Sequence, residues 1–198
     1  MNYLAHAYLS FGETEILVGN IISDFVKGKK RFSYAEGIQK GITLHRQIDR
    51  FSDEHEATRE AKTIFQPHYR SYSGAFVDVV FDHFLATDKT VFSETQLGAF
   101  AREVYTILTN HQSIFPERFS VLFPYMQQQN WLLNYHTVWG TEKSFGGLAR
   151  RARYIDEVNT ACNLFEAHYH FLKDCYRQFF PDVKAFAHHM YEELMSQS

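Results

Sequence analysis

Residues 76–85 read FVDVVFDHFL, a stretch whose only ionisable side chains belong to Asp78, Asp82 and His83. Residues four apart lie about 40° apart around an α-helix, so Asp78 and Asp82 share one face. All other residues of the stretch are Phe, Val or Leu. A carboxylate in apolar surroundings is costly unless another group pairs with it or a metal ion coordinates it. The stretch therefore predicts an apolar helix that carries a polar, functional cluster.

A second signature, GITLHRQID, occupies residues 41–49. The preceding residues favour a helix that starts at a capping box of Ser33 and Glu36 and carries Ile38 and Ile42 on one stripe. Extending that stripe along the helix reaches His45 and then Asp49, because both keep the helical spacing. The pattern predicts an imidazole–carboxylate pair at the edge of the hydrophobic core.

The two signatures together point to a metal-assisted hydrolytic site. Imidazole nitrogen and carboxylate oxygen suit Mn²⁺, Fe²⁺, Mg²⁺ or Zn²⁺. The chain lacks cysteines at ligand spacing, which argues against a structural zinc site. A bound divalent ion can polarise a phosphoryl oxygen and lower the pKa of a bound water molecule. His6 and Asp24, near the ends of neighbouring expected helices, are further candidates.

Helical periodicity dominates the chain, and no alternating strand pattern exceeds a few residues. We therefore expect an all-α fold, in which residues 1–198 form a single domain of about eight helices. A capping box of Ser93 and Gln96 is expected to open one helix, and Pro67 and Pro181 are expected to interrupt or kink two others. The expected helical segments cover residues 2–10, 13–26, 33–50, 54–70, 71–88, 93–109 and 154–195, with a less regular stretch around Pro116 and Pro124.

Composition restricts the class of protein. A net charge of −3 does not favour general nucleic-acid binding. No run of about 18 apolar residues is present, so no membrane span is expected. Cys162 and Cys175 are isolated in the sequence, and the N-terminal segment lacks a basic region and a cleavage site. We therefore expect a cytoplasmic protein.

Four blocks of sequence resemble the bacterial acyl carrier protein phosphodiesterases: MNYLAHAYLS at residues 1–10, GNIISDFVKG at 19–28, GITLHRQIDRFSD at 41–53 and DVVFDHFL at 78–85. The segments ARRARY at 149–154 and EAHY at 166–169 look similar too. The resemblance spans nearly the whole chain in order. It implies a distorted branch of the HD-domain, metal-dependent phosphohydrolases.

The resemblance implies a defined reaction, hydrolysis of the phosphodiester that joins 4′-phosphopantetheine to a serine of holo acyl carrier protein. Mn²⁺ is the implied metal, with Mg²⁺, Fe²⁺ or another divalent ion as alternatives. Matching the blocks residue by residue gives a set of expected metal ligands and a set of expected catalytic acids. The ligands are His6, Asp24, His45, Asp82 and His83, and the catalytic acids are Asp24, Asp49 and Asp78.

One feature departs from the usual HD pattern, because the adjacent pair here is Asp82-His83 rather than His-Asp. The ligand roles of ordinary HD enzymes therefore do not transfer directly to these residues, although the residues themselves stay candidates. Two alternatives remain open. One is a related phosphohydrolase that acts on a nucleotide or another small phosphoester, and the other is a non-catalytic helical binding protein whose buried acids are structural.

Basic residues flank the expected site. They fall in a turn that contains Lys27 and Lys29, and on a helix face that carries Arg46 and Arg50 next to the face of His45. Such a rim can bind phosphate or an acidic protein. Because acyl carrier proteins are strongly acidic, the family resemblance makes these four residues the expected contacts with holo acyl carrier protein.

Overall fold

The computed structural model describes residues 1–151 and 155–196. These residues form eleven α-helices and four short 3₁₀ helices, and no strand occurs among them. The expectation of an all-α fold is confirmed. The α-helices are α1 (Tyr3–Tyr8), α2 (Thr14–Ile22), α3 (Glu36–Glu54), α4 (Glu56–Tyr69), α5 (Ser73–Thr87), α6 (Glu94–Asn110), α7 (Glu117–Gln128), α8 (Trp131–Asn134), α9 (Val138–Arg151), α10 (Asn159–Ala167) and α11 (Tyr169–Ser196).

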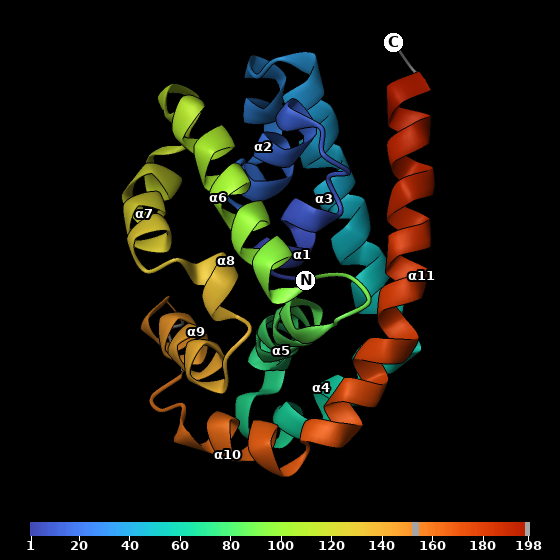
Figure 1. Ribbon diagram of the computed structural model, residues 1–198, viewed down its shortest axis with the longest axis vertical. Helices are drawn as coiled ribbons and strands as arrows, with labels where there is room; N and C mark the ends of the chain where they lie inside the picture. Colours follow the sequence, from blue (N-terminus) through green and yellow to red (C-terminus); the bar gives the residue numbers. More distant parts are fainter. Residues whose placement is uncertain (152–154, 197–198) are drawn as a thin grey trace.

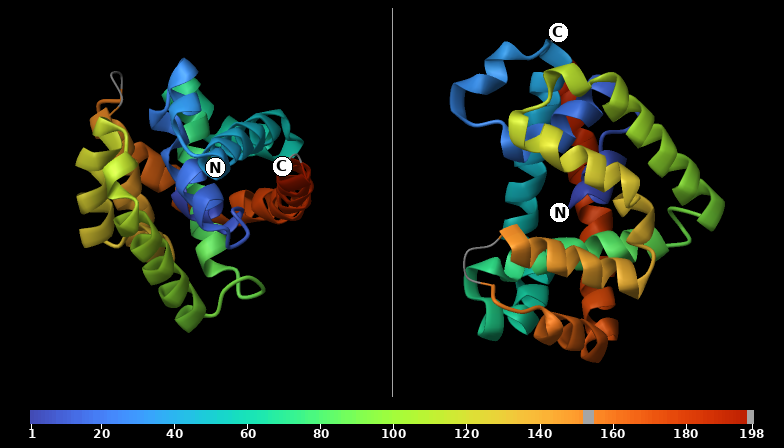
Figure 2. Two further views of the ribbon diagram at one scale, coloured as in Figure 1. Left: turned by 90° about the horizontal axis from the view of Figure 1, so that it is seen from above. Right: turned by 90° about the vertical axis from the view of Figure 1, so that its left-hand side faces the viewer.

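Helix α5 lies in the interior, with the other helices arranged around it and around the short helix α1 (Figure 1). Helices α3 and α11 run side by side along one flank, and α6 and α7 cover the other (Figures 1 and 2). The continuous run from Phe76 to Ala86 is buried apart from Asp78. A helix that is apolar on nearly every side is stable only when neighbours cover it, which explains its central place.

Helices α2 and α3 approach each other closely because each has a glycine at the point of contact. A Cβ atom added to Gly19 would collide with the backbone oxygen of Ile38. A Cβ atom added to Gly41 would collide with the backbone oxygen of Ile16. Only the absence of side chains at these two positions lets the backbones meet. This contact fixes α3, which carries two of the site residues, against the N-terminal half of the chain.

Several helix boundaries differ from those expected. The capping box at Ser93 and Gln96 is confirmed, but the one at Ser33 is wrong. The Ser33 hydroxyl donates to the backbone oxygen of Lys30, and α3 begins after Ala35 without a side-chain cap. A short 3₁₀ helix, Gly28–Ser33, takes up Ser33 instead.

The prolines interrupt the helices less than expected. Helix α4 continues through Pro67, and α11 continues through Pro181, although the axis of α11 bends in Figure 1. A proline removes only one backbone donor, and packing of the apolar stripe holds the turn together. The expected segment 154–195 is divided at His168 into two helices, and its first residue lies outside the described residues. This division adds one helix to the expected eight, and α8 and α9, which no expected segment covers, add two more.

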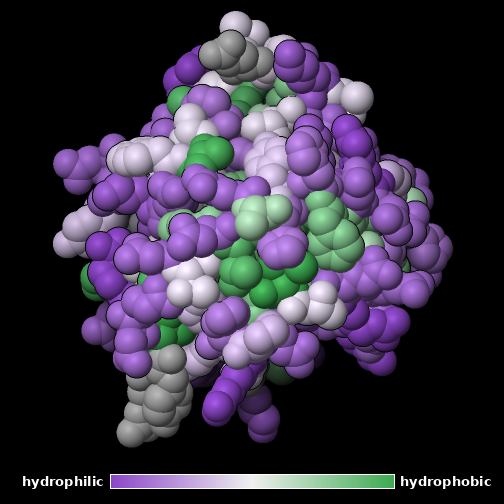
Figure 3. Space-filling model, turned by 90° about the horizontal axis from the view of Figure 1, so that it is seen from below, coloured by the Kyte–Doolittle hydropathy of each residue, from purple (hydrophilic) through white to green (hydrophobic). Residues whose placement is uncertain are grey.

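The buried residues form one hydrophobic cluster that runs through the whole bundle. The face seen from below carries a patch of hydrophobic residues surrounded by hydrophilic ones (Figure 3). No helix in the described part of the chain has both the length and the apolar character needed to span a bilayer.

Candidate functional site

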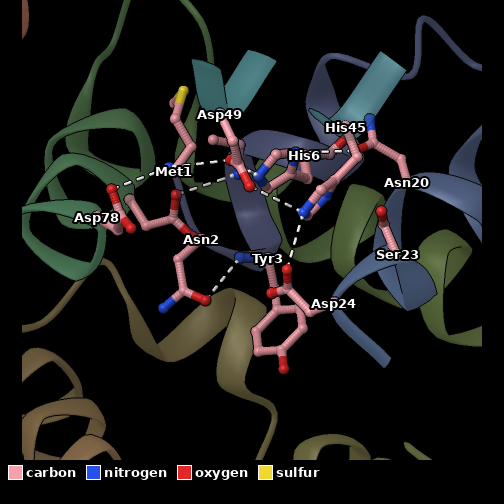
Figure 4. Close-up of polar contacts among 12 residues, drawn as sticks. Met1, Asn2, Tyr3, His6, Asn20, Ser23, Asp24, His45, Asp49 and Asp78 are labelled. Atoms are coloured by element: carbon pink, nitrogen blue, oxygen red, sulfur yellow. Dashed lines mark hydrogen bonds and ion pairs between the residues drawn. The ribbon is translucent and has the colours of Figure 1, made fainter. Parts of the chain in front are cut away.

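Three of the expected site residues converge beside the N-terminus. His6 on α1 meets His45 and Asp49 on α3, and one donor atom from each lies within 4.8 Å of the other two. Figure 4 shows the two imidazole rings side by side with the Asp49 carboxylate facing both. The His6 and His45 rings are stacked, with centroids 4.0 Å apart. Stacking aims the two Nε2 atoms in the same direction.

Asp49 is the residue that both histidines share. His6 Nε2 lies 3.1 Å from Asp49 Oδ1, and His45 Nε2 lies 3.0 Å from Asp49 Oδ2. His6 and His45 are 3% and 5% exposed, whereas the Asp49 side chain is 39% exposed. The cluster is therefore built into the core on the imidazole side and open to solvent on the carboxylate side.

Helix α3 supplies His45 and Asp49 in the way that the sequence pattern predicts. Its buried stripe contains Ile38, Ile42 and His45, and Asp49 continues it four residues later. The i, i+4 spacing brings the two polar groups into contact. The predicted pair at the edge of the core is therefore confirmed.

The tautomer of His6 follows from its hydrogen bonds. The Ser10 hydroxyl donates to the backbone oxygen of His6, so its oxygen is free to accept from Asn20 Nδ2. Asn20 Nδ2 also donates to the His6 backbone oxygen, at 2.9 Å. These bonds place the Asn20 carbonyl oxygen 2.8 Å from His6 Nδ1, which must therefore be the donor.

Neutral His6 consequently has a lone pair on Nε2, directed at the carboxylate oxygen of Asp49. The pKa of His6 is lowered, because burial and the nearby His45 both disfavour its charged form. Two lone pairs facing each other across 3.1 Å repel unless a cation lies beside both. The imidazole is thus held in the orientation and tautomer of a metal ligand.

Asp24 brings a second carboxylate to the cluster. It lies in the 3₁₀ helix Ser23–Phe25 that follows α2, and its Oδ1 atom is 3.1 Å from His45 Nε2. The hydrogen bond from His45 lowers the pKa of Asp24. The Asp24 side chain is 70% exposed, so it lies where the cluster meets solvent.

The two carboxylates create a demand for positive charge at His45 Nε2. Burial lowers the pKa of His45, but hydrogen bonds to Asp24 and Asp49 outweigh it and raise the value to about 9. Burial raises the pKa of Asp49, but the hydrogen bond from His45 and the nearby Met1 ammonium group lower it well below the usual range. A proton on His45 satisfies this demand in a metal-free protein, and a divalent cation can take its place.

The donor atoms fit a divalent ion in kind and in spacing. Two imidazole nitrogens and a carboxylate, with a second carboxylate beside them, form a mixed N/O set that suits Mn²⁺, Fe²⁺ or Zn²⁺. Ligand atoms bound to one ion at about 2.1 Å lie roughly 3.0–3.4 Å from each other. The observed separations of 3.0 and 3.1 Å fall in that range.

Asp78 lies next to this cluster but has a different partner. The α-ammonium group of Met1 is buried and lies 2.9 Å from Asp78 Oδ1 and 3.7 Å from Asp49 Oδ1. Burial lowers the pKa of this ammonium, but the carboxylates of Asp78 and Asp49 outweigh burial and raise it to about 10. Asp78 and Asp24 both line a cavity of about 340 Å³, so two of the three expected catalytic acids border the same space.

Asp82 lies outside the cluster of His6, His45 and Asp49. It is fully buried, and its two oxygens accept hydrogen bonds from the backbone N–H groups of Leu4 and Ala5, at 2.8 and 3.2 Å. Burial raises the pKa of Asp82 to about 7. The first turn of α1 thus supplies the partner that the buried carboxylate needs. In this position Asp82 anchors α1, and the expected role as a metal ligand is not supported.

His83 is also separate from the cluster. Its Nδ1 atom lies 2.8 Å from the backbone oxygen of Tyr135, and its Nε2 atom lies 3.0 Å from the Tyr169 hydroxyl. Both ring nitrogens therefore have partners, so neither is available to a metal. Burial lowers the pKa of His83 to about 4, so the ring is neutral at physiological pH. The sequence places His83 next to Asp82, but the helix directs the two side chains to different neighbours.

The expected basic rim is exposed at one end of α3. Lys27 and Lys29 lie in the turn after Asp24, and Arg46 donates to the backbone oxygen of Val26. Arg50 forms an ion pair with Glu54, at 3.0 Å, so part of its charge is neutralised. Lys27, Lys29 and Arg46 are therefore stronger candidates for a partner contact than Arg50.

The fold and the site together define an all-α enzyme in which imidazole and carboxylate groups converge at the edge of the core beside a cavity. Comparison with known proteins narrows this class. A family model described as acyl carrier protein phosphodiesterase matches residues 1–183, and the chain belongs to that family.

Curated relatives carry the same name. The chain is similar to acyl carrier protein phosphodiesterases from Photorhabdus laumondii (31% identical, covering 91% of this chain and 92% of the relative) and Yersinia pestis (32%, covering 96% and 98%). A relative from Escherichia coli O139:H28 is also 32% identical, over 96% of this chain and 98% of its own. No solved structure matches the chain. The HD-like character of the fold therefore stays a prediction.

Sequence reasoning missed two contributors to this site. Asn20 determines the orientation of His6, and the Met1 ammonium group pairs with Asp78. Asp49 was expected as a catalytic acid, and the structure places it beside His6 and His45 in the group that could hold a metal ion. Asn20 could have been found, because a polar residue in the apolar run of GNII needs a buried partner.

Proposed function

We propose that this protein hydrolyses the phosphodiester between 4′-phosphopantetheine and a serine of holo acyl carrier protein, and that it does so with a divalent metal, Mn²⁺ first. The names of the relatives support the substrate and the reaction class. The convergence of His6, His45 and Asp49 is the observation that supports the metal. We also propose a cytoplasmic location, which agrees with the two unpaired cysteines.

The residues of the site have different roles in the proposed reaction. His6, His45 and Asp49 would hold the metal, with Asp24 beside them as a further ligand or as a contact of the attacking water. When bound, the metal would polarise the phosphoryl oxygen and acidify water. Asp24, ionised because its pKa is lowered, can accept a hydrogen bond from that water and orient it.

The reaction balances with water as the only co-reactant. The water oxygen joins phosphorus, the bond from phosphorus to the serine oxygen breaks, and the serine oxygen takes up a proton. The products are apo acyl carrier protein and free 4′-phosphopantetheine. Met1 lines the cavity shared by Asp24 and Asp78, and its buried ammonium offsets the negative charge of the Asp78 carboxylate.

The test is an assay of apo carrier protein by mass spectrometry, with metal-depleted enzyme and added Mn²⁺. We expect Asp49→Asn to reduce the rate on the order of 100-fold or more, because it removes a shared contact of both histidines. Asp182→Asn is a matched control, since Asp182 pairs with His55 at 3.2 Å outside the cluster. Wild-type enzyme that leaves holo carrier protein intact with every divalent metal would refute the proposed activity.

A second measurement tests the metal independently. Isothermal titration of metal-free protein with Mn²⁺ should show one saturable site that is lost in His45→Ala and kept in Asp182→Asn. Equal binding by both variants would mean that the ion binds elsewhere. Activity that survives complete chelation would remove the metal from the mechanism.

A further inference from the structure

A larger hollow adjoins the cavity of Asp24 and Asp78. Its volume is about 520 Å³, and it lies between the start of α1, helix α8 and helix α9. We call it the aromatic groove, because Tyr3, Trp131, Tyr135 and Trp139 line it. Trp139 is 58% exposed, an unusual position for a large ring on a protein surface.

The aromatic groove shares two lining residues with the cavity of Asp24 and Asp78. Asn2 and Tyr3 line both spaces, and the cavity of about 340 Å³ also contains Asp24 and Asp78. Figure 4 shows Tyr3 between Asn2 and Asp24. A ligand whose phosphate occupies the cavity can therefore extend past Asn2 and Tyr3 into the groove.

The chemistry of the groove indicates what such a ligand contains. Aromatic rings form its walls, and amide side chains of Asn2, Gln129 and Asn134 supply donors and acceptors. Among the described residues that line it, none is a carboxylate, and Lys143 and Arg150 on α9 provide positive charge. These walls suit a chain that is uncharged, partly apolar and interrupted by amide groups, with a phosphate at one end.

We propose that the aromatic groove holds the pantetheine arm of the substrate while the cavity of Asp24 and Asp78 holds its phosphate. The proposal rests on the proposed function, since it assigns a place to a part of that substrate. The arm has two amide bonds between apolar segments, so it matches both the aromatic walls and the amide side chains. The volume of about 520 Å³ falls in the range of sites that enclose a drug-sized molecule.

Both tryptophans of the chain, Trp131 and Trp139, line this groove, so intrinsic fluorescence reports directly on its occupancy. The probes are pantetheine, 4′-phosphopantetheine, inorganic phosphate and adenosine monophosphate, titrated into the full-length metal-free protein. We expect a saturable change in emission with the first two probes and none with phosphate. A response to adenosine monophosphate but not to pantetheine would overturn the proposal, as would no response at all.

Two adjacent glycines on α9 provide a matched pair of variants. A Cβ atom added to Gly146 or Gly147 meets no atom within 4 Å, so either position accepts a side chain, but only Gly147 lines the groove. We expect Gly147→Leu to weaken pantetheine binding at least about 10-fold and to raise KM for holo carrier protein to a similar extent. Gly146→Leu should resemble the wild type in both. Equal effects of the two substitutions would overturn the proposal.

The two measurements separate this proposal from the proposed function. Pantetheine binding that Gly147→Leu weakens, in an enzyme without hydrolytic activity, would support the groove and refute the activity. Hydrolysis of holo carrier protein by an enzyme whose fluorescence ignores pantetheine, and whose Gly147→Leu variant keeps its KM, would refute the groove alone.

Discussion

At the scale of single residues, the site depends on one asparagine as much as on its histidines. Asn20 accepts from His6 Nδ1 at 2.8 Å and donates to the His6 backbone oxygen at 2.9 Å. It therefore holds the imidazole by two atoms and determines which nitrogen carries the lone pair. His45 differs, because its Nδ1 atom is buried without a hydrogen-bond partner among the described residues. Asn20 therefore orients the His6 ring, whereas no comparable contact in the described part of the chain orients the Nδ1 side of His45.

We expect Asn20→Ala to lower the affinity for Mn²⁺ about 10- to 100-fold, because the substitution frees the ring of His6 while keeping every ligand. The measurement is isothermal titration of the metal-free variant, with circular dichroism to check its helix content. The loss of buried hydrogen bonds should also lower the free energy of unfolding by about 1–3 kcal/mol. A loss of stability with unchanged metal affinity would limit Asn20 to a structural role.

His83 predicts a pH dependence of stability that is separate from the metal site. Its pKa is lowered from 6.5 to about 4 in the folded protein, so the unfolded chain binds a proton first as the pH falls. Neutral His83 therefore makes its full contribution to the free energy of unfolding above pH 6.5, and this contribution decreases as the pH falls toward 4. By linkage, it decreases by about 2 kcal/mol between pH 6.5 and about pH 5.

Urea denaturation of the wild type and His83→Gln, in the presence of EDTA, measures this effect. Between pH 6.5 and about pH 5, we expect the free energy of unfolding of the wild type to fall by about 2 kcal/mol more than that of the variant. Parallel pH profiles would show that the pKa of His83 is the same in the folded and the unfolded protein. Comparing the two proteins cancels the contributions of other histidines, because both share them.

At the scale of elements, the short distance between α2 and α3 controls the position of the site. Asn20 comes from α2, and His45 and Asp49 come from α3. The two helices touch through Gly19 and Gly41, where any side chain would meet the backbone of the partner. A backbone contact cannot yield as a flexible side chain would, so the helices must separate if either glycine is replaced.

We expect Gly41→Ala to lower the free energy of unfolding by about 2 kcal/mol or more, against the usual benefit of alanine in a helix. Gly98→Ala on α6 is the control, because a Cβ atom there meets only the Arg102 side chain at 3.5 Å. That substitution should raise the stability by roughly 0.5–1 kcal/mol. Chemical denaturation measures both, and equal stabilisation by the two would contradict the close contact of α2 and α3.

At the scale of the whole molecule, the charge is distributed unevenly around the site. The chain has a net charge of −3, but the exposed residues Lys27, Lys29 and Arg46 lie together near Asp24. An acidic protein partner would approach this side, and its attraction is screened within roughly 10 Å at moderate salt. Small uncharged substrates would not respond to this arrangement.

The double substitution Lys27→Ala and Lys29→Ala should reduce kcat/KM for holo carrier protein about 3- to 10-fold at low salt, mainly by slowing association. The difference from wild type should disappear as salt is added. Lys89→Ala with Arg102→Ala serves as the control, because both residues are exposed and line neither cavity. An equal loss in the control pair would show that only overall charge matters.

The all-α class and the pairing of His45 with Asp49 could both be predicted from the sequence. Both follow from helical periodicity, which is a local property of the chain. The sequence also identified Asp78 and Asp82 as acids that need partners, because their neighbours in the sequence are apolar. What it could not provide was the identity of those partners, which are the Met1 ammonium and the first turn of α1.

Which candidates form one site depends on how the helices pack together. Adjacent residues on a helix point about 100° apart, so Asp82 and His83 face different neighbours despite their adjacency. His6 on α1 meets Asp49 on α3 and is held by Asn20 on α2, and Gly19 and Gly41 let α2 and α3 approach each other. The aromatic groove likewise brings Asn2 and Tyr3 together with residues 129–150. No local sequence pattern spans such a separation along the chain.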